Sequence, residues 1–311
     1  MGRPTEVRIR VPGSTANLGP GFDSFGLALG LYDELEVCAT STPGVSVEVS
    51  GEGKGRVPLS ARHLVVRAMH QAFELFGDAP AGIRLRCTNS VPHSRGLGSS
   101  AAAAVSGAVA AAVLAGREIE GEREALLQLS AGIEGHADNA AASLLGGFVV
   151  AWETSSRSAS GASINTGAAR RFHAERLDVH PDVHPVACVA SAESATKTTR
   201  GLLPDRIPLA DAAFTGSRTA LGVLAMTARP DLLLAATEDR LHQPYRRPAY
   251  PDSLDLVEWL RARGVPAAVS GAGPTVVALT TDGRLPDGAE RDGFTVLGLP
   301  IDRAGIHVDT A

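Results

Sequence analysis

The order of hydrophobic and polar positions predicts a chain of mixed strands and helices. Residues 7–11 alternate between apolar and charged side chains, as in a strand with one buried face. A Gly- and Pro-rich turn is expected over 12–21, and apolar residues recur at helical spacing over 63–76. The same patterns predict strands at 35–39, 45–49, 83–87, 148–152, 186–190 and 267–269, and helices at 100–114, 123–134, 209–226, 232–238 and 254–263.

These elements follow one another without a regular strand–helix–strand repeat. An α+β fold is therefore favoured over a doubly wound parallel sheet. Residues 154–166 are rich in Ser, Ala and Gly and hold almost no large apolar side chain, so they are the best candidate for a domain boundary or flexible loop. We expect one domain over residues 1–160 and a second over 161–311.

Composition and charge exclude several classes of protein. The net charge is −5, and acidic and basic residues are interleaved without the Lys/Arg block of a nucleic-acid-binding protein. Cys38, Cys87 and Cys188 lie far apart and form no CxxC pair, which argues against a disulfide framework or structural zinc. No apolar stretch is long enough for a membrane span, and none precedes the first strand as a signal would. We expect a cytoplasmic protein with no nucleic-acid or membrane partner.

The strongest chemical signal is a glycine-rich turn that opens an Ala-rich helix. Two glycines permit a tight turn, and we expect Ser99 or Ser100 to cap the helix. The free N–H groups and positive dipole end of such a helix suit a phosphate, to which Arg95 can add a charged hydrogen bond. No Lys follows as in a Walker A loop, and an ordinary strand–turn–helix joint is the alternative. The run is Pro92-His93-Ser94-Arg95-Gly96-Leu97-Gly98-Ser99-Ser100-Ala101-Ala102.

This run, at residues 92–102, resembles the phosphate-binding motif of the GHMP kinases, the family of galactokinase and of homoserine, mevalonate and phosphomevalonate kinases. Residues 12–23 (PGSTANLGPGFD) resemble the N-terminal signature of the homoserine kinase branch, and 270–275 (SGAGPT) resemble the C-terminal glycine motif. The three motifs lie in the family's order and span nearly the whole chain. The resemblance implies a ribosomal-protein-S5-like nucleotide-binding domain followed by a ferredoxin-like domain.

The resemblance also implies an activity: phosphorylation of the side-chain hydroxyl of L-homoserine by ATP with Mg²⁺, a step toward threonine. Residues 92–102 would bind the nucleotide, and Ser100 and Glu134 would hold the metal ion. Oxygen ligands of this kind suit Mg²⁺, and water molecules usually complete the coordination shell of the ion. Read alone, Glu134 is an ordinary surface residue near the end of a helix.

An amino-acid substrate presents an ammonium, a carboxylate and a hydroxyl group, and each needs a partner. Asp23 can pair with the ammonium and Asn17 can fix orientation, although both are ordinary turn formers when read alone. Arginine binds a carboxylate bidentately, and the resemblance gives this role to Arg200 and Arg246, each otherwise a solvated surface charge. Further substrate contacts implied by the resemblance come from His136, Thr196 and Gly271.

The sequence offers no evident general base. Asn139 stands where other GHMP kinases have an aspartate, and an amide cannot accept the hydroxyl proton; Asp138 is the alternative base. Without a base, catalysis would rest on positioning and on charge stabilisation by Mg²⁺, the helix start and Arg95, with the proton passing directly to a γ-phosphate oxygen.

Several alternatives stay open. Ala142 and Ala195 replace the proline and serine common in homoserine kinases, which leaves room for a kinase acting on a homoserine analogue or another small alcohol. A non-catalytic binding protein of the same fold is a second alternative. A hydrolase using Ser99 or Ser100 is a third, although the chain has no GxSxG elbow. A homodimer is possible.

Overall fold

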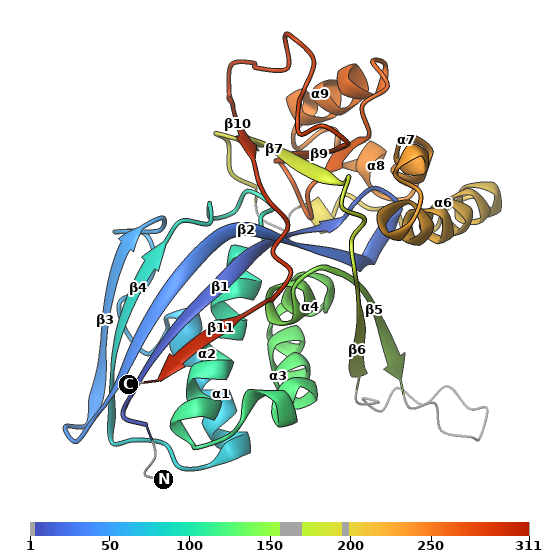
Figure 1. The fold of residues 1–311 in the computed structure, drawn as a ribbon. Helices are drawn as coiled ribbons and strands as arrows, with labels where there is room; N and C mark the ends of the chain where they lie inside the picture. Colours follow the sequence, from blue (N-terminus) through green and yellow to red (C-terminus); the bar gives the residue numbers. More distant parts are fainter. Residues whose placement is uncertain (1–3, 156–169, 195–198, 311) are drawn as a thin grey trace.

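The computed structural model describes residues 4–155, 170–194 and 199–310, which form two sheets with helices packed against them (Figure 1). The first sheet has the order β11-β1-β2-β4-β3, with β5 pairing β2 and β6 pairing β5. Strands β3 and β4, which α1 connects in the chain, pair parallel to each other. The other strand pairs of this sheet are antiparallel. Its strands are β1 (Glu6–Asn17), β2 (Gly21–Thr40), β3 (Gly44–Gly51), β4 (Gly82–Asn89), β5 (Phe148–Ser155), β6 (Arg170–Leu177) and β11 (His307–Thr310).

Four helices cover one face of this sheet (Figure 1): α1 (Leu64–Phe76), α2 (Ser99–Leu114), α3 (Ile119–Glu134) and α4 (Asp138–Leu145). Helix α2 is almost entirely buried, which its run of alanines and valines permits because the helix is apolar on every side. Small residues also let its neighbour approach closely, since a Cβ at Gly107 would lie 2.4 Å from the carbonyl oxygen of Val65 in α1. Helix α2 is therefore the centre of the larger core, and its position fixes the glycine turn that precedes it.

The second sheet has the order β10-β7-β9-β8 and packs against α9, whose Leu254, Val257 and Leu260 are buried in a separate core. A third cluster joins the two layers, because Phe25, Leu27 and Leu29 of β2 pack with residues of β7, β9 and α6. The turn between β1 and β2 is thereby placed at the junction of the layers. These elements are β7 (His184–Ala190), α6 (Leu209–Thr227), the 3₁₀ helix η1 (Pro230–Leu232), α7 (Leu233–Ala236), α8 (Gln243–Arg246), α9 (Pro251–Arg261), β8 (Ala267–Val269), β9 (Val276–Thr280) and β10 (Phe294–Gly298).

The predicted α+β class is confirmed, but the N-terminal turn is shorter than the sequence suggested. Strand β1 continues past a bulge at Pro12 and Gly13 to Asn17, and only residues 18–20 turn before β2 begins. The prediction of a turn over 12–21 was wrong because Ser14 and Thr15, though polar, are fully buried in the sheet. Glycine, proline and small polar residues gave no alternating pattern there.

The domain boundary expected at residues 154–166 begins at the end of β5, and from residue 156 on it lies outside the described part of the chain. From the second half, β6 and β11 join the first sheet, β11 beside β1, so the two ends of the chain lie close together (Figure 1). The division into 1–160 and 161–311 stays a prediction.

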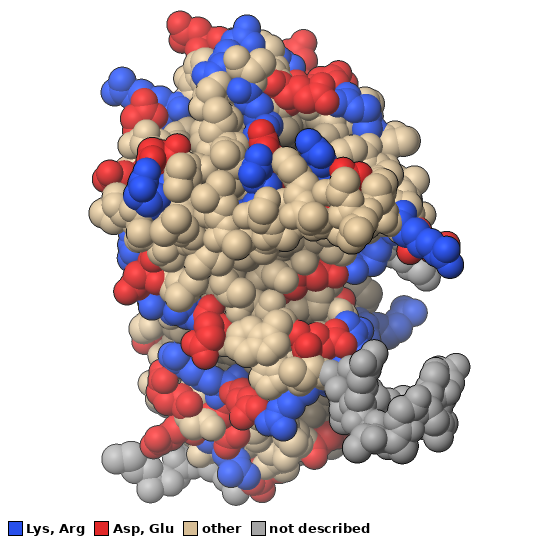
Figure 2. Space-filling view, turned by 90° about the vertical axis from the view of Figure 1, so that its right-hand side faces the viewer, with Lys and Arg blue, Asp and Glu red and all other residues tan. Residues whose placement is uncertain are grey.

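Charge is spread in small mixed groups over the face that Figure 2 shows, with a largely uncharged band across its middle. Acidic and basic side chains lie next to one another on this face rather than in large areas of one sign. Among the helices in the described ranges, none is long and apolar enough to cross a membrane.

Candidate active site

A cavity of about 490 Å³ collects most of the side chains that the sequence singled out. Its walls come from β1, β2 and β4, from the starts of α1 and α2, and from the turn between α3 and α4. The predicted site residues that line it are Asn17, Asp23, His93, Ser94, Gly96, Gly98, Ser99, Ser100, Glu134, His136, Asp138, Asn139, Arg200, Arg246 and Gly271. Thr196 lies outside the described residues.

The start of α2 is open to a ligand. Its N-cap is Gly98, in the left-handed conformation at φ 71°, and no side chain caps the helix. The prediction that Ser99 or Ser100 would cap it was therefore wrong. The first helical hydrogen bond runs from the N–H of Ala102 to the carbonyl of Gly98 at 2.9 Å. The three N–H groups before it have no acceptor within the helix, so this end can bind an anion.

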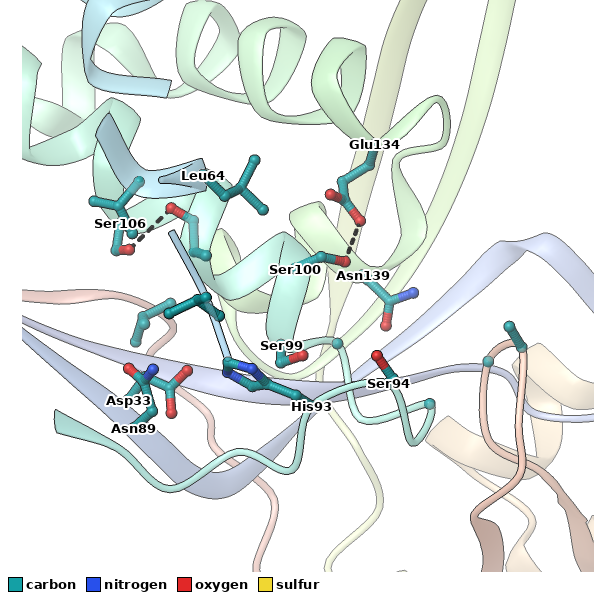
Figure 3. Close-up of a pocket in the computed structure, with 18 of the residues that line it drawn as sticks. Asp33, Leu64, Asn89, His93, Ser94, Ser99, Ser100, Ser106, Glu134 and Asn139 are labelled. Carbon is teal, nitrogen blue, oxygen red and sulfur yellow. Dashed lines mark hydrogen bonds between the residues drawn. The ribbon is translucent and has the colours of Figure 1, made fainter. Parts of the chain in front are cut away.

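Ser100 and Glu134 bring a hydroxyl and a carboxylate together beside this helix start (Figure 3). The hydroxyl of Ser100 donates to Oε2 of Glu134 at 2.7 Å. Burial raises the pKa of Glu134, although the Ser100 hydrogen bond opposes the shift. A carboxylate that is costly to ionise gains from a nearby cation, so the pair fits Mg²⁺. Within the described ranges, no three His, Cys, Asp or Glu side chains gather to hold a metal ion.

The turn from α3 to α4 carries a second polar group. Oδ1 of Asp138 accepts from Nδ1 of His136 at 2.6 Å and from the backbone N–H of Asn139 at 2.7 Å. Burial opposes protonation of His136, but the hydrogen bond and charge of Asp138, with the charges of Asp23 and Glu134, outweigh it and raise its pKa. Oδ1 of Asn139 is occupied by the hydroxyl of Ser14 at 3.0 Å. Ser14, which the sequence reading did not single out, therefore orients Asn139.

Asn17 links the two glycine motifs at the other end of the cavity. Its Oδ1 accepts the backbone N–H of Asp23 at 3.0 Å, and its Nδ2 donates to the carbonyl of Gly271 at 2.8 Å. Arg246 donates to the same carbonyl at 3.0 Å. Asn17 is 4% exposed and at φ 68°, so its amide supports the site by holding the backbone in place.

Arg246 is buried at 2% exposure, and no carboxylate of the described residues lies within 4.0 Å of its guanidinium. Burial lowers its pKa. Arg200, in contrast, holds both oxygens of Asp23 at 2.7 and 2.9 Å, and both partners are partly exposed. Of these two arginines, Arg246 is therefore the one without an opposite charge beside it among the described residues, and the carboxylate of a ligand can supply one.

Arg95 does not reach the cavity. Its guanidinium lies 3.6 Å from Glu52 and 3.7 Å from Glu193, and it donates to the carbonyl of Ser191 at 3.3 Å. In this arrangement it ties the glycine turn to neighbouring loops, and its contact with phosphate stays a prediction. Of the other nucleotide residues expected, Pro92, Leu97, Ala101 and Ala102 do not line the cavity, the last three because their side chains are in the core.

The remaining wall of the cavity has no sequence motif. Val57, Pro58, Leu64 and Val65 supply apolar surface near the start of α1. Asp33 and Asn89 lie together across from Leu64, as Figure 3 shows. Burial raises the pKa of Asp33 to about 6, while hydrogen bonds from the backbone of Val91 and Ser90 oppose the shift.

Comparisons with known proteins show the family to which the chain belongs. Family models described as GHMP kinases N terminal domain and GHMP kinases C terminal match residues 63–147 and 218–292. The homoserine kinase of Rhodococcus erythropolis is 50% identical over 311 residues, covering 98% of this chain and 96% of the relative. The homoserine kinase of Streptomyces avermitilis is 46% identical over 309 residues, covering 98% of this chain and 96% of the relative.

Solved structures show the same fold. The crystal structure of homoserine kinase from Cytophaga hutchinsonii superposes with a TM-score of 0.80 at 24% identity, covering 99% of both chains. The structure of a putative homoserine kinase from Listeria monocytogenes superposes with a TM-score of 0.71 at 29% identity, covering 98% of this chain and 99% of that one. With two family models over more than half of its length and full-length relatives of about half identical sequence, the chain belongs to the GHMP kinase family, among the homoserine kinases.

Proposed function

We propose that the protein transfers the γ-phosphoryl group of MgATP to the side-chain hydroxyl of L-homoserine, giving ADP and O-phospho-L-homoserine. The observation that carries the proposal is a single cavity with an open helix start at α2 and, elsewhere on its wall, the buried guanidinium of Arg246. A phosphate suits the first and a carboxylate suits the second.

The amino-acid end matches a zwitterion. Arg246 lacks a carboxylate partner among the described residues, and a substrate carboxylate supplies one. Asp23 and Arg200 neutralise each other in the absence of substrate. An amino acid can exchange with this pair, its ammonium on Asp23 and its carboxylate on both arginines, without leaving a charge unpaired. A neutral alcohol cannot do so, which favours homoserine over mevalonate-type or sugar substrates.

The nucleotide end suits ATP, which GHMP kinases use. The free N–H groups at the start of α2 bind phosphate oxygens, and the apolar surface of Val57, Pro58, Leu64 and Val65 receives the base. Ser100 and Glu134 would hold Mg²⁺ together with phosphate oxygens and water. The ion supplies charge neutralisation for the transferred group.

The proton of the substrate hydroxyl passes directly to an oxygen of the transferred phosphoryl group in this proposal. Asn139 is an amide held by Ser14 and cannot take the proton. Asp138 is 2% exposed and already accepts from His136, so it orients that imidazole toward the substrate. Phosphoryl transfer asks little of a base when the reactants are well placed. A cytoplasmic location and a homodimer stay predictions.

Steady-state kinetics of Arg246→Lys and Asp23→Asn test the amino-acid end. We expect the KM for L-homoserine to rise by about 30-fold or more in each, because the substrate carboxylate loses a bidentate guanidinium in the first and the substrate ammonium loses its carboxylate partner in the second. The KM for ATP should stay near the wild-type value. Arg240→Lys is the matched control, since Arg240 is 53% exposed and pairs with Asp211 at 3.5 Å. An unchanged homoserine KM in Arg246→Lys would contradict the proposal.

A further inference from the structure

The ring of Phe22 is the common neighbour of the two arginines in the amino-acid site. The guanidinium carbon Cζ lies 5.2 Å from the ring centroid for Arg200 and 5.6 Å for Arg246. Both distances are within the range of a cation–π contact. The imidazole ring of His242 also packs against the Phe22 ring; the centroids of these two rings are 5.2 Å apart and their planes are tilted by 31°. Phe22 itself has no polar atom to offer a substrate.

The backbone on both sides of Phe22 is held firmly. Asp23, the next residue, sits at φ 55° and is fixed by the side chain of Asn17. Before it, the carbonyl of Gly19 accepts Nε2–H of His242 at 2.7 Å. His242 is fully buried, and burial lowers its pKa, so the imidazole is a neutral donor. The ring is therefore held at the start of β2, directly after a turn whose backbone is fixed by these hydrogen bonds.

The electrostatics of the site favour such a ring. Arg246 is buried without a carboxylate partner among the described residues. Burial and the charge of Arg200 lower its pKa, while Tyr250 and Asp23 oppose the shift. Two guanidinium groups near one another repel, most strongly where water is scarce. The negative face of an aromatic ring stabilises a nearby cation without accepting a proton or competing for the hydrogen bonds of the guanidinium fork.

We propose that Phe22 is a positioning residue, whose ring keeps the guanidinium groups of Arg200 and Arg246 in place to receive the substrate carboxylate. The inference rests on the proposed function, because it takes these arginines as the carboxylate site. It adds that the aromatic ring, rather than its volume alone, sets affinity for an amino acid.

Titration calorimetry of Phe22→Met and Phe22→Tyr tests this inference. Methionine fills nearly the same space without a ring, and tyrosine keeps the ring. We expect the Kd for L-homoserine to rise about tenfold in Phe22→Met and to change less than about threefold in Phe22→Tyr. The KM for ATP and the melting temperature should stay close to those of the wild type in both.

The decisive comparison uses 3-amino-1-propanol, which has the hydroxyl and ammonium of homoserine but no carboxylate. Its affinity, measured by displacement, should not change in Phe22→Met, because the ring acts only through the arginines. Equal weakening of both ligands in Phe22→Met, or an unchanged Kd for L-homoserine in that variant, would overturn the inference. Turnover of L-homoserine by the wild type would in that case still support the proposed function. A wild-type protein that does not bind L-homoserine would overturn both.

Discussion

Single residues in this site hold charges that are incompletely neutralised until a ligand arrives. Arg246 is buried without a carboxylate partner among the described residues, and Glu134 carries a raised pKa because burial disfavours its charge. Such arrangements cost stability in the empty protein. They are useful because the lost free energy returns when a carboxylate or a cation binds, so the ligand and the fold stabilise each other.

Glu134→Gln should retain the fold and lose most of the activity. The amide can still accept the Ser100 hydroxyl, but it cannot offer a negative charge to Mg²⁺. We expect kcat to fall about 10²- to 10³-fold and more Mg²⁺ to be needed for half-maximal rate. Glu120→Gln is the matched control, because Glu120 lies on the same helix and is 78% exposed. A normal Mg²⁺ dependence in Glu134→Gln would exclude this residue from the metal site.

Asp33 predicts a pH-dependent loss of stability. Its folded pKa of about 6 exceeds the ordinary value of 3.8, so the folded state prefers the protonated carboxyl. The stabilising contribution is complete below pH 3.8 and is lost as pH rises through about 6. From pH 4 to 7, Asp33→Asn should therefore gain roughly 2 kcal/mol of unfolding free energy relative to the wild type.

Denaturant unfolding at a series of pH values measures this difference. Asp178→Asn is the control, since that side chain is 81% exposed. Parallel pH profiles for the wild type and Asp33→Asn would show that Asp33 titrates normally.

The sequence predicted the residues whose role depends on side-chain chemistry within a motif. Asn17, Asp23, Glu134 and Arg246 all line one cavity, although they lie far apart in the chain. Arg95 shows the limit, because neighbouring Glu52 and Glu193 draw its guanidinium away from the glycine turn. Which of several nearby charges pairs with an arginine depends on distances that only the fold sets.

Helix α2 joins the core to the chemistry. The alanines and valines that bury it on every side also hold its uncapped start at the cavity wall. Close packing against α1 at Gly107 fixes its position, since a Cβ there would meet the backbone of Val65. Backbone cannot move aside as a flexible side chain can, so the two helices tolerate no extra atom at this point.

Gly107→Ala should accordingly destabilise the protein despite the better helix propensity of alanine. We expect a loss of about 1–3 kcal/mol from overpacking and a lower melting temperature. Gly132→Ala in α3 is the matched control, because nothing lies within 4 Å of a Cβ there, and alanine should stabilise that helix by up to about 1 kcal/mol. Equal effects of the two substitutions in thermal unfolding would contradict the packing argument.

At the level of elements, hydrophobic periodicity predicted α1, α2 and α3 of the first sheet's helices well, but it missed the short helix α4. It failed for β1 beyond residue 11, where small buried polar residues break the alternation, and for the short strand β11, whose place beside β1 depends on long-range pairing. The wall formed by Val57, Pro58 and Leu64 was also missed, because apolar residues in a connecting segment carry no signature of a ligand.

In the whole molecule, one cavity is formed between segments distant in the sequence, and the proposed function places both substrates in it. Residues from β1, the starts of α1 and α2, the α3–α4 turn and α8 meet there, so neither half of the chain carries the site alone. The three sequence motifs indicated this assembly and the family fold. Hydrophobic periodicity did not indicate this assembly, because the contact between the two sheets depends on the packing of β2 against α6 and the second sheet.

Because the proposed function places both substrates in one cavity and needs no enzyme nucleophile, phosphoryl transfer should occur within a ternary complex. Initial rates measured while ATP and L-homoserine are both varied should give intersecting double-reciprocal lines. Parallel lines, or a phosphorylated protein isolated after incubation with ATP alone, would indicate a covalent intermediate instead.

The most direct test of the account is a coupled ADP-release assay with MgATP, comparing L-homoserine with L-serine, L-threonine, mevalonate and galactose. The account predicts rapid turnover with L-homoserine, with O-phospho-L-homoserine as the product, and little with the others, which lack either the zwitterion or the correctly placed hydroxyl. Absence of turnover with L-homoserine, together with phosphorylation of another alcohol, would contradict the substrate assignment. Bound ATP with no turnover of any alcohol would contradict the catalytic assignment itself.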